Sequence, residues 1–248
     1  MAARKVAVLV FPGTNSEDET CRILRAVGLD AHLVHWSCAA RLPQYEAFVL
    51  PGGFSYEDRI RAGAVAAHDA MLDYVIDAAQ NEKLILGICN GAQILLEAGL
   101  VPGTGTIRRP TAAFTHNAPV PHFICKHVRV RLNVEPSRSP FTAGMNREEV
   151  FPAWAAHGQG RLAATPAHLE ELVHGRHVAF VYENGAPNGS ALDCAGLLND
   201  AGNVCAIMPH PERDAWSFNH PDRREGGILT PSGGVRFFQS FAQAMERP

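Results

Sequence analysis

An apolar run that ends in a Gly-x-Cys-x-Gly turn limits, more than any other feature, what this chain can fold into. Residues 83–88 have the composition of a buried strand, and residues 90–96 form a helix-favouring run, with Cys89 between Gly87 and Gly91. A sharp strand-to-helix turn of this kind holds a nucleophile at the carboxyl end of a sheet strand. Glycine is needed on both sides because a side chain there would crowd the turn and the packing of helix on strand. The pattern predicts a nucleophilic Cys89 on an α/β sheet.

Backbone donors around Cys89 are the next expectation. A helix that begins near Asn90 directs its free N–H groups and the positive end of its dipole at the sulfur, which favours a thiolate and can hold an oxyanion. The N–H of Asn90 is one expected oxyanion donor, and the N–H of Gly53, at the end of an earlier strand, is the second. The plainer alternatives are a small buried Cys89 and an ordinary turn at Pro51-Gly52-Gly53. The flanking glycines after a strand favour the catalytic interpretation.

A thiol nucleophile needs a base, and the base needs a group that orients it. Among twelve histidines, His210 directly follows an apolar strand and stands two residues before Glu212. Alternate side chains of an extended segment point to the same side, so Glu212 is expected to accept the Nδ1 proton and to leave Nε2 facing Cys89. A surface turn that merely contains His and Glu is the alternative, and it would be favoured if Cys89 were absent.

Strand-like and helix-like segments alternate through the first hundred residues. The expected strands are residues 6–11, 31–36, 47–50 and 83–88, and the expected helices begin after Ser16, near Ala67 and after Cys89. Ser16 and Glu19 have the spacing of a capping box, and Gly28 is a stop signal for the same helix. This alternation predicts a doubly wound, mostly parallel sheet with helices on both faces, whose ligands bind at the carboxyl ends of the strands.

Short strands and irregular connections replace that alternation from Gly103 onward. The expected strands are residues 123–132, 150–155, 178–182, 194–198 and 204–208, with a hairpin turn signal at residues 200–203. Residues 214–234 have loop composition, and residues 235–245 are expected to form a closing helix whose buried face holds Phe237, Phe238, Phe241 and Met245. No linker-like stretch separates the halves, so one domain over residues 1–248 with an antiparallel extension is predicted.

Composition narrows the classes of partner and cofactor. The formal net charge of -3 gives no electrostatic case for nucleic acid or an anionic membrane. Six scattered cysteines without a C-x-x-C pair, and no signal or membrane-spanning segment, predict reduced thiols in a cytoplasmic protein. No phosphate-loop motif and no His–Cys cluster with metal spacing are present, so neither a cofactor nor a metal is expected in this chain. His116, His122 and His127 are expected at a surface or interface.

Three motifs together resemble the class I (triad-type) glutamine amidotransferases. They are Gly87-Ile88-Cys89-Asn90-Gly91 with Gln93, Pro51-Gly52-Gly53-Phe54-Ser55-Tyr56 with Asp58, and Met208-Pro209-His210-Pro211-Glu212-Arg213. Within that superfamily the chain is similar, nearly end to end, to the glutaminase subunits of phosphoribosylformylglycinamidine synthases from de novo purine biosynthesis. The resemblance implies the flavodoxin-like fold of class I amidotransferases.

The resemblance also implies a mechanism. Cys89 attacks the side-chain amide of L-glutamine, His210 protonates the departing ammonia, and water activated by His210 hydrolyses the thioester. Gln93 is implied as a contact to glutamine, with His157 and Gly158 as further lining of the pocket. Ammonia is then implied to pass to a separate synthetase subunit, which carries ATP and Mg and converts formylglycinamide ribonucleotide to formylglycinamidine ribonucleotide. A small accessory subunit is a further candidate partner.

Three features depart from the family pattern, and several alternatives stay open. Ala92 stands where a bulky Phe is expected, Glu57 stands where Gly is frequent, and the stretches 110–121 and 214–234 differ from the family. The alternatives are a glutaminase of another class I pathway, a Cys hydrolase on a similar sheet, and a non-catalytic, redox-sensing or chaperone-like domain. An acid that follows the histidine by two residues disfavours the hydrolase order of nucleophile, acid and histidine. A non-catalytic domain has no need for the His210–Glu212 pair.

Overall fold

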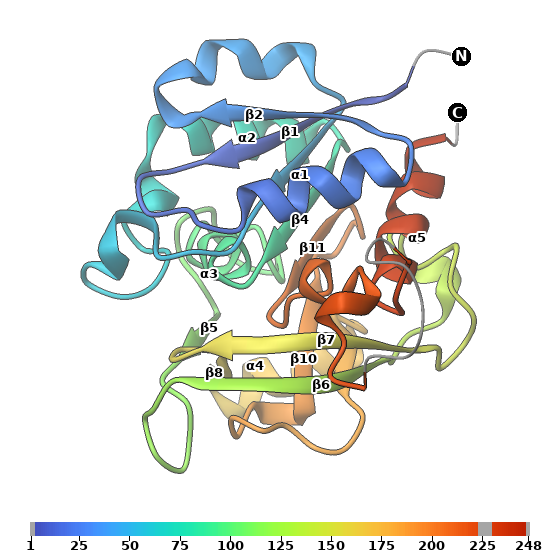
Figure 1. The fold of residues 1–248 in the computed structure, drawn as a ribbon. Coiled ribbons are helices and arrows are strands. Elements are labelled where there is room, and N and C mark those ends of the chain that lie inside the picture. The colour runs from blue at the N-terminus through green and yellow to red at the C-terminus, as the bar shows by residue number, and fades with distance from the viewer. Residues whose placement is uncertain (1–2, 223–229, 247–248) are drawn as a thin grey trace.

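A nine-stranded sheet lies at the centre of the computed structural model, which describes residues 3–222 and 230–246 (Figure 1). Its strand order is β2-β1-β3-β4-β11-β10-β9-β6-β7. The strands are β1 (Lys5–Val10), β2 (Asp30–His35), β3 (Ala47–Leu50), β4 (Leu84–Ile88), β6 (Ile124–Leu132), β7 (Val150–His157), β9 (Val178–Tyr182), β10 (Cys194–Leu198) and β11 (Val204–Ile207). The strands of both halves of the chain therefore share one sheet.

The first five strands in this order are parallel, as the alternating pattern predicted. The connections among β1 to β4, and the segment after β4, contain α1 (Glu17–Ala26), the 3-10 segments η1 (Trp36–Gln44), η2 (Ser55–Asp58) and η3 (Ala66–His68), α2 (Ala70–Gln80) and α3 (Asn90–Glu97). Helix α1 and the C-terminal α5 (Val235–Glu246) contact each other on one face, and α2 and α3 lie on the other (Figure 1). The doubly wound architecture is confirmed.

The remaining strands are antiparallel and extend the same sheet. Strand β11 pairs with β10 in antiparallel register, and β10, β9, β6 and β7 follow in turn. The hairpin between β10 and β11 turns at Gly202, whose φ of +81° is a left-handed conformation that glycine adopts without penalty. The predicted antiparallel extension and hairpin are confirmed.

Three elements were not expected from the sequence. Strands β5 (Ala112–Thr115) and β8 (Arg161–Ala164) form a separate two-stranded sheet, and α4 (Pro166–His174) follows β8. The two short strands pair across a long sequence separation, so no hairpin turn signals their pairing. Helix α4 buries Leu172 alone fully, which leaves little apolar periodicity to detect. The start of α4 does have sequence signals. Thr165 caps the helix by accepting a hydrogen bond from the His168 N–H, and Pro166 occupies the first helical position.

The predicted capping box at the start of α1 is wrong. Ser16 precedes the helix but makes no side-chain cap. Its hydroxyl instead accepts a hydrogen bond of 2.7 Å from Arg213 Nη2, and Arg213 Nε lies 3.4 Å from Glu19 Oε1. The spacing of Ser16 and Glu19 predicted that the Ser16 hydroxyl would accept from a backbone N–H of its own helix. It accepts instead from the guanidinium of Arg213, which is distant in the sequence. The predicted stop is confirmed, because α1 ends at Ala26, before Gly28 at φ +95°.

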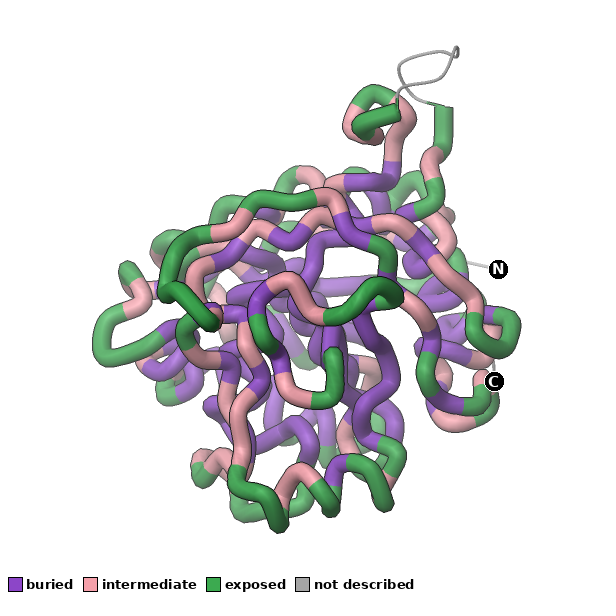
Figure 2. Tube along the Cα trace, turned by 90° about the horizontal axis from the view of Figure 1, so that it is seen from below, coloured by how far each residue is buried: buried purple, intermediate pink, exposed green. Residues whose placement is uncertain are grey.

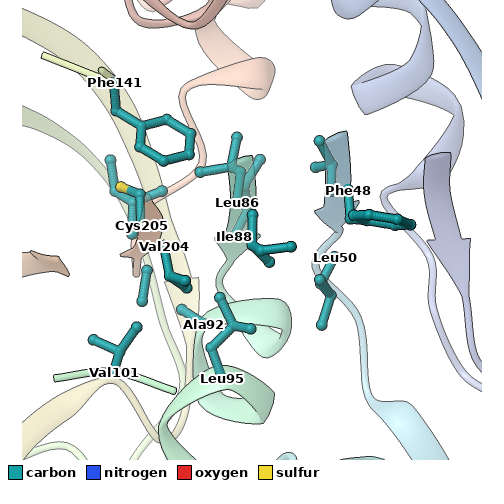
Figure 3. Packing of buried hydrophobic residues seen from close by; sticks show 14 of the residues in the cluster. Phe48, Leu50, Leu86, Ile88, Ala92, Leu95, Val101, Phe141, Val204 and Cys205 are labelled. Carbon is teal, nitrogen blue, oxygen red and sulfur yellow. The ribbon is translucent and has the colours of Figure 1, made fainter. Parts of the chain in front are cut away.

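The core fills the space between the sheet and its helices, and exposed residues lie at the periphery (Figure 2). Ala92 is fully buried in α3 among packed core side chains (Figure 3). The turn after β4 admits no added side chain, since a Cβ on Gly91 would lie 1.9 Å from the Leu50 carbonyl oxygen and one on Gly87 would lie 2.6 Å from Leu95 Cδ1. The predicted need for both glycines follows directly from these contacts.

The C-terminal region is described in part. The predicted loop 214–234 includes residues 223–229, which lie outside the described residues. Its described parts hold the end of the 3-10 turn η6 (Glu212–Asp214) and the turn η7 (Ser217–Asn219). In α5 the predicted apolar side chains are buried, namely Phe237, Phe238, Phe241 and Met245. Over residues 3–222 and 230–246, no helix has the length and apolar character to cross a membrane.

Candidate active site

Cys89 lies at the carboxyl end of β4, in a backbone conformation that few residues adopt. Its φ is +52° and its ψ is −106°, in a position that immediately precedes α3. The N–H of Cys89 donates to the Ile207 carbonyl at 2.8 Å, and its own carbonyl accepts from the Gln93 N–H at 3.1 Å. Strain of this kind persists only where the surroundings enforce it, and it is found at functional sites. The strained strand-to-helix turn predicted for Cys89 is present.

His210 and Glu212 reach the same place from the neighbouring strand. Strand β11 pairs directly with β4, so the residues that follow it lie beside Cys89. His210 Nδ1 lies 2.5 Å from Glu212 Oε1, and both side chains are buried. The His210 ring and Cys89 line the same cavity. Burial opposes a charge on the ring, but the adjacent Glu212 and Cys89 outweigh it and raise the pKa of His210.

The pairing of His210 with Glu212 arises differently from the predicted alternation along an extended segment. His210 is held in extended backbone by paired hydrogen bonds with Trp154 of 2.8 and 3.1 Å. Pro211, however, has helical dihedrals, and Glu212 opens the turn η6. The carboxylate therefore returns to the imidazole through a turn. Gly52 leaves room for the ring, because a Cβ there would lie 2.5 Å from His210 Cε1.

The two expected oxyanion donors have geometry that suits the role. The Gly52 carbonyl accepts hydrogen bonds from the N–H groups of Asn15 and Ser16 at 3.1 and 3.2 Å. Since the carbonyl and N–H of a trans peptide point in opposite directions, the N–H of Gly53 points away from that loop. Gly53 lines the same cavity as Cys89. Asn90 opens α3, where backbone N–H groups have no partner within the helix.

A cavity of about 270 Å³ brings the predicted residues together. Its lining includes Gly53, Cys89, Gln93, His157, Gly158 and His210. Glu212 lies behind His210 and is not among the lining residues. A larger hollow of about 680 Å³, which Arg131 and Arg176 help to line, contains no cysteine, serine or histidine in its wall. The smaller cavity is the candidate active site, because it alone of the two holds a nucleophile and a base.

Comparison with known proteins gives the family. Residues 3–243 match the family described as the CobB/CobQ-like glutamine amidotransferase domain. The chain belongs to this family of glutamine amidotransferases. The match covers almost the whole chain and includes the strand-to-helix turn at Cys89 and the segment at His210.

Curated relatives of this amidotransferase have one name in common. A protein of Methanosphaera stadtmanae is 36% identical over 236 residues, which cover 95% of this chain and 96% of that protein. A protein of Symbiobacterium thermophilum is 43% identical over 218 residues, covering 84% of this chain and 87% of that protein. Both are named phosphoribosylformylglycinamidine synthase subunit PurQ.

A solved structure has the same fold. The structure of PurLQS from Thermotoga maritima contains a chain that matches this amidotransferase with a TM-score of 0.77 and 33% identity, covering 96% of this chain and 97% of that chain. The glutaminase domain of CTPS from Trypanosoma brucei, at 15% identity and a TM-score of 0.56, agrees in fold alone. The predicted class I amidotransferase fold is thereby confirmed.

The other predicted pocket residues of the amidotransferase are held by hydrogen bonds. Gln93 Nε2 donates to the Gln159 carbonyl at 2.5 Å, and Gln93 Oε1 accepts from Asn90 Nδ2 at 2.9 Å. His157 is buried, and its Nδ1 lies 3.3 Å from Asn117 Oδ1. Burial, with the charge of His210 as a second cause, lowers the pKa of His157 to about 3. So weak a base suits a pocket wall better than proton transfer near neutral pH.

The buried His157 is expected to make the stability of the amidotransferase depend on pH. In the unfolded chain a histidine takes up its proton near pH 6.5, whereas folded His157 stays neutral down to about pH 3. As the pH falls through this window, the unfolded state binds the additional proton, so His157 lowers the unfolding free energy by about 1.4 kcal/mol per pH unit. We expect His157→Gln to reduce the loss of stability between about pH 7.5 and about pH 5 by about 2 kcal/mol, measured by urea unfolding.

Exposed His68 provides the matched control for this measurement. His68→Gln should leave the pH dependence of the unfolding free energy as it is in the wild type. A His157→Gln protein whose stability changes with pH as steeply as the wild type would contradict the assignment, even if its absolute stability were altered by the lost packing.

Sequence reasoning missed several residues that shape the site. Asn117 donates to the carbonyls of His122 and His157 at 2.9 and 2.8 Å and accepts from the Gly160 N–H at 3.1 Å, which fixes one rim of the cavity. No local pattern distinguishes this asparagine. Asp58 lines the cavity too, and its place in the motif that begins at Pro51 was an available signal.

One cluster of potential metal ligands was not foreseen from the sequence. His127, which was expected at a surface or interface, is partly exposed, and its Nε2 lies 2.6 Å from Oδ2 of the fully buried Asp214. Ligand atoms of His127, Asp214 and His220 lie within 4.8 Å of one another. Sequence spacing gave no indication, because 87 residues separate His127 from Asp214. None of the three lines the Cys89 cavity, so we assign them no part in the thiol chemistry. His116 and His122 are exposed, as predicted, and lie on the cavity wall.

Proposed function

We propose that this amidotransferase is the glutaminase subunit of a phosphoribosylformylglycinamidine synthase. It hydrolyses L-glutamine to glutamate and ammonia and passes the ammonia to a synthetase subunit. The observation that carries the proposal is the buried array in which Cys89 and His210 line one cavity and Glu212 holds His210 from behind, on a chain whose curated relatives are PurQ subunits. A strained cysteine with a built base and orienting acid disfavours a non-catalytic domain.

The first half of the reaction forms a thioester. A raised pKa of His210 favours the proton on the imidazole, which leaves the Cys89 sulfur as the nucleophile. The sulfur attacks the amide carbon of glutamine, and the negative charge moves to the amide oxygen. The N–H groups of Gly53 and Asn90 hold that oxygen. Collapse of the intermediate breaks the carbon–nitrogen bond, and the nitrogen leaves as ammonia with the proton of His210.

The second half of the reaction hydrolyses the thioester. Neutral His210 now removes a proton from water, whose oxygen attacks the same carbonyl carbon through a second oxyanion. The carbon–sulfur bond breaks, glutamate leaves, and the proton on His210 restores the starting pair. Glu212 holds the ring through Nδ1 in both halves and stabilises the imidazolium. Gln93, His157 and Gly158 are proposed to contact glutamine in the cavity.

Partners and location follow from the same proposal. The sequence has no phosphate-loop motif, so we place ATP and Mg on the synthetase subunit, which converts formylglycinamide ribonucleotide to formylglycinamidine ribonucleotide. A small accessory subunit is proposed as the third component, and the solved PurLQS structure supports an assembly of this kind. We propose that residues 1–248 act as a single glutaminase domain in the cytoplasm.

The test measures glutamate and ammonia release from glutamine by the isolated chain and by its mixture with the synthetase, ATP and formylglycinamide ribonucleotide. We expect low release from the isolated chain and a large rise in the mixture, with Cys89→Ala as the blank. Release that ignores the synthetase would assign the glutaminase to another pathway. No Cys89-dependent release under any condition would refute the proposed function.

A further inference from the structure

One corner of the cavity holds two oxygen atoms side by side. Asn90 Nδ2 donates to Asp58 Oδ1 at 3.1 Å and to Gln93 Oε1 at 2.9 Å. The orientation of this amide is fixed, because Asn90 Oδ1 accepts from the Ser55 N–H at 3.0 Å. Asp58 and Gln93 both line the cavity that contains Cys89. The oxygens therefore lie together, near the nucleophile, and one of them carries a charge.

Among the described residues, none forms an ion pair with the Asp58 carboxylate. Burial raises the pKa of Asp58 to about 6, and the hydrogen bond from Asn90 opposes this effect without cancelling it. Nearby Arg59 and Arg61 pair with Glu57 and Glu97. The Gln93 amide nitrogen is already used by the Gln159 carbonyl. A partly buried carboxylate without a counter-charge is unfavourable, so a cationic ligand group would gain by binding here.

Arg213 also lines the cavity, but it belongs to a different arrangement. Its guanidinium donates to the Ser16 hydroxyl at 2.7 Å and lies 3.4 Å from the Glu19 carboxylate. These contacts hold it against the start of α1. Arg213 therefore has partners of its own, and the carboxylate of Asp58 stays open to a ligand.

The backbone around Asp58 is strained in a way that suits a binding loop. Tyr56, Glu57 and Asp58 have φ values of +53°, +60° and +51°, so three consecutive residues other than glycine are left-handed. Such conformations persist where other contacts enforce them. Here Tyr56 donates from its hydroxyl to Asp69 at 2.5 Å. The departure at Glu57 is explained as well, since glycine adopts this φ freely and glutamate does so at a cost.

We propose that Asp58, with Gln93 beside it, binds the α-ammonium group of glutamine and selects amides that carry one. This inference rests on the proposed function. The α-nitrogen of an extended glutamine lies about 5 Å from the amide carbon that Cys89 attacks, given standard bond lengths. Asn90 directly follows Cys89 and holds both oxygens, and Asp58 and Gln93 line the cavity that contains Cys89. Asp58 is thus a specificity residue that touches the substrate at the end opposite to the reaction.

The test compares glutamine with 4-carboxybutanamide, which lacks only the α-amino group, in the complex with the synthetase. Single-turnover rates with enzyme in excess make slow hydrolysis measurable. We expect the wild type to prefer glutamine by about 10²-fold in kcat/KM, as one charged hydrogen-bonded contact provides. Asp58→Asn should lower the value for glutamine by a similar factor and leave that for 4-carboxybutanamide unchanged. Exposed Glu57→Gln, the matched control, should alter neither.

An equal loss for both substrates in Asp58→Asn would overturn the inference, because it would indicate a role in shaping the loop. An unchanged preference for glutamine would overturn it too. Failure of the proposed function is a separate outcome, since it requires that the wild type release no glutamate in a Cys89-dependent manner.

Discussion

Replacing Cys89 with serine is expected to lower kcat for glutamine hydrolysis by about 10⁴-fold or more, with the fold retained. The hydroxyl fits the same position after β4, and serine meets the strain at φ +52° no worse than cysteine. A serine hydroxyl, however, does not yield its proton to His210 as a thiol does, so the attacking group stays neutral. Glutamate release in the synthetase complex measures the loss of kcat. Thermal unfolding of the variant tests whether the fold is retained.

Cys125 provides the control, since it is exposed and lies outside the Cys89 cavity. Cys125→Ser should hydrolyse glutamine at the wild-type rate. In the wild type, glutamine should slow the alkylation of Cys89 by iodoacetamide and leave that of Cys125 unaffected. A Cys89→Ser enzyme within tenfold of the wild type would refute the assigned nucleophile.

Glu212→Gln is expected to lower kcat by about 10³- to 10⁴-fold, as loss of the orienting carboxylate does in related triads. The substitution also changes the pH profile, and its sign follows from the site. Glu212 helps to raise the pKa of His210 against the effect of burial, so removing its charge lowers that pKa. In the proposed mechanism protonated His210 delivers the proton to ammonia, so loss of that proton sets the alkaline limb of the pH profile. That limb should move to lower pH in the variant.

The measurement is kcat across the pH range for wild type and variant in the same synthetase complex. Glu171→Gln removes an exposed carboxylate from α4 and should leave both the rate and the profile unchanged. A variant that loses activity without any movement of the alkaline limb would show that Glu212 does not control the protonation of His210.

The parts of the site that sequence predicted are those with a local signal. Cys89 has glycines on both sides, and His210 stands directly after a strand with an acid two residues on. Cys89 and His210 lie close together because β11 pairs in parallel with β4, so that both residues stand at the carboxyl end of their strand at the same edge of the sheet. Even there, the contact between His210 and Glu212 depends on a turn at Pro211 that alternation along a strand did not predict.

The parts that sequence did not predict depend on contacts between distant residues. The Ser16 hydroxyl was assigned to its own helix, but it accepts from Arg213, 197 residues away. The bridge from Asn90 to Asp58 joins residues 32 apart through a loop whose shape no periodicity describes. Strands β5 and β8 are each four residues long, and no tight turn connects them. Neither strand is therefore long enough to show a clear alternation of apolar and polar residues, and no turn motif indicates that they pair.

The last strand among residues 3–222 and 230–246, β11, lies inside the sheet between β4 and β10, and this position has a consequence for biosynthesis. As the chain leaves the ribosome, Cys89 emerges well before β11, and the strands made first have no neighbour on the β4 edge until β11 inserts there. The base and its acid follow that insertion immediately. A nascent chain that has not reached residue 212 thus has a thiol without its proposed general base, and the proposed hydrolysis of glutamine becomes possible only after that residue has been made.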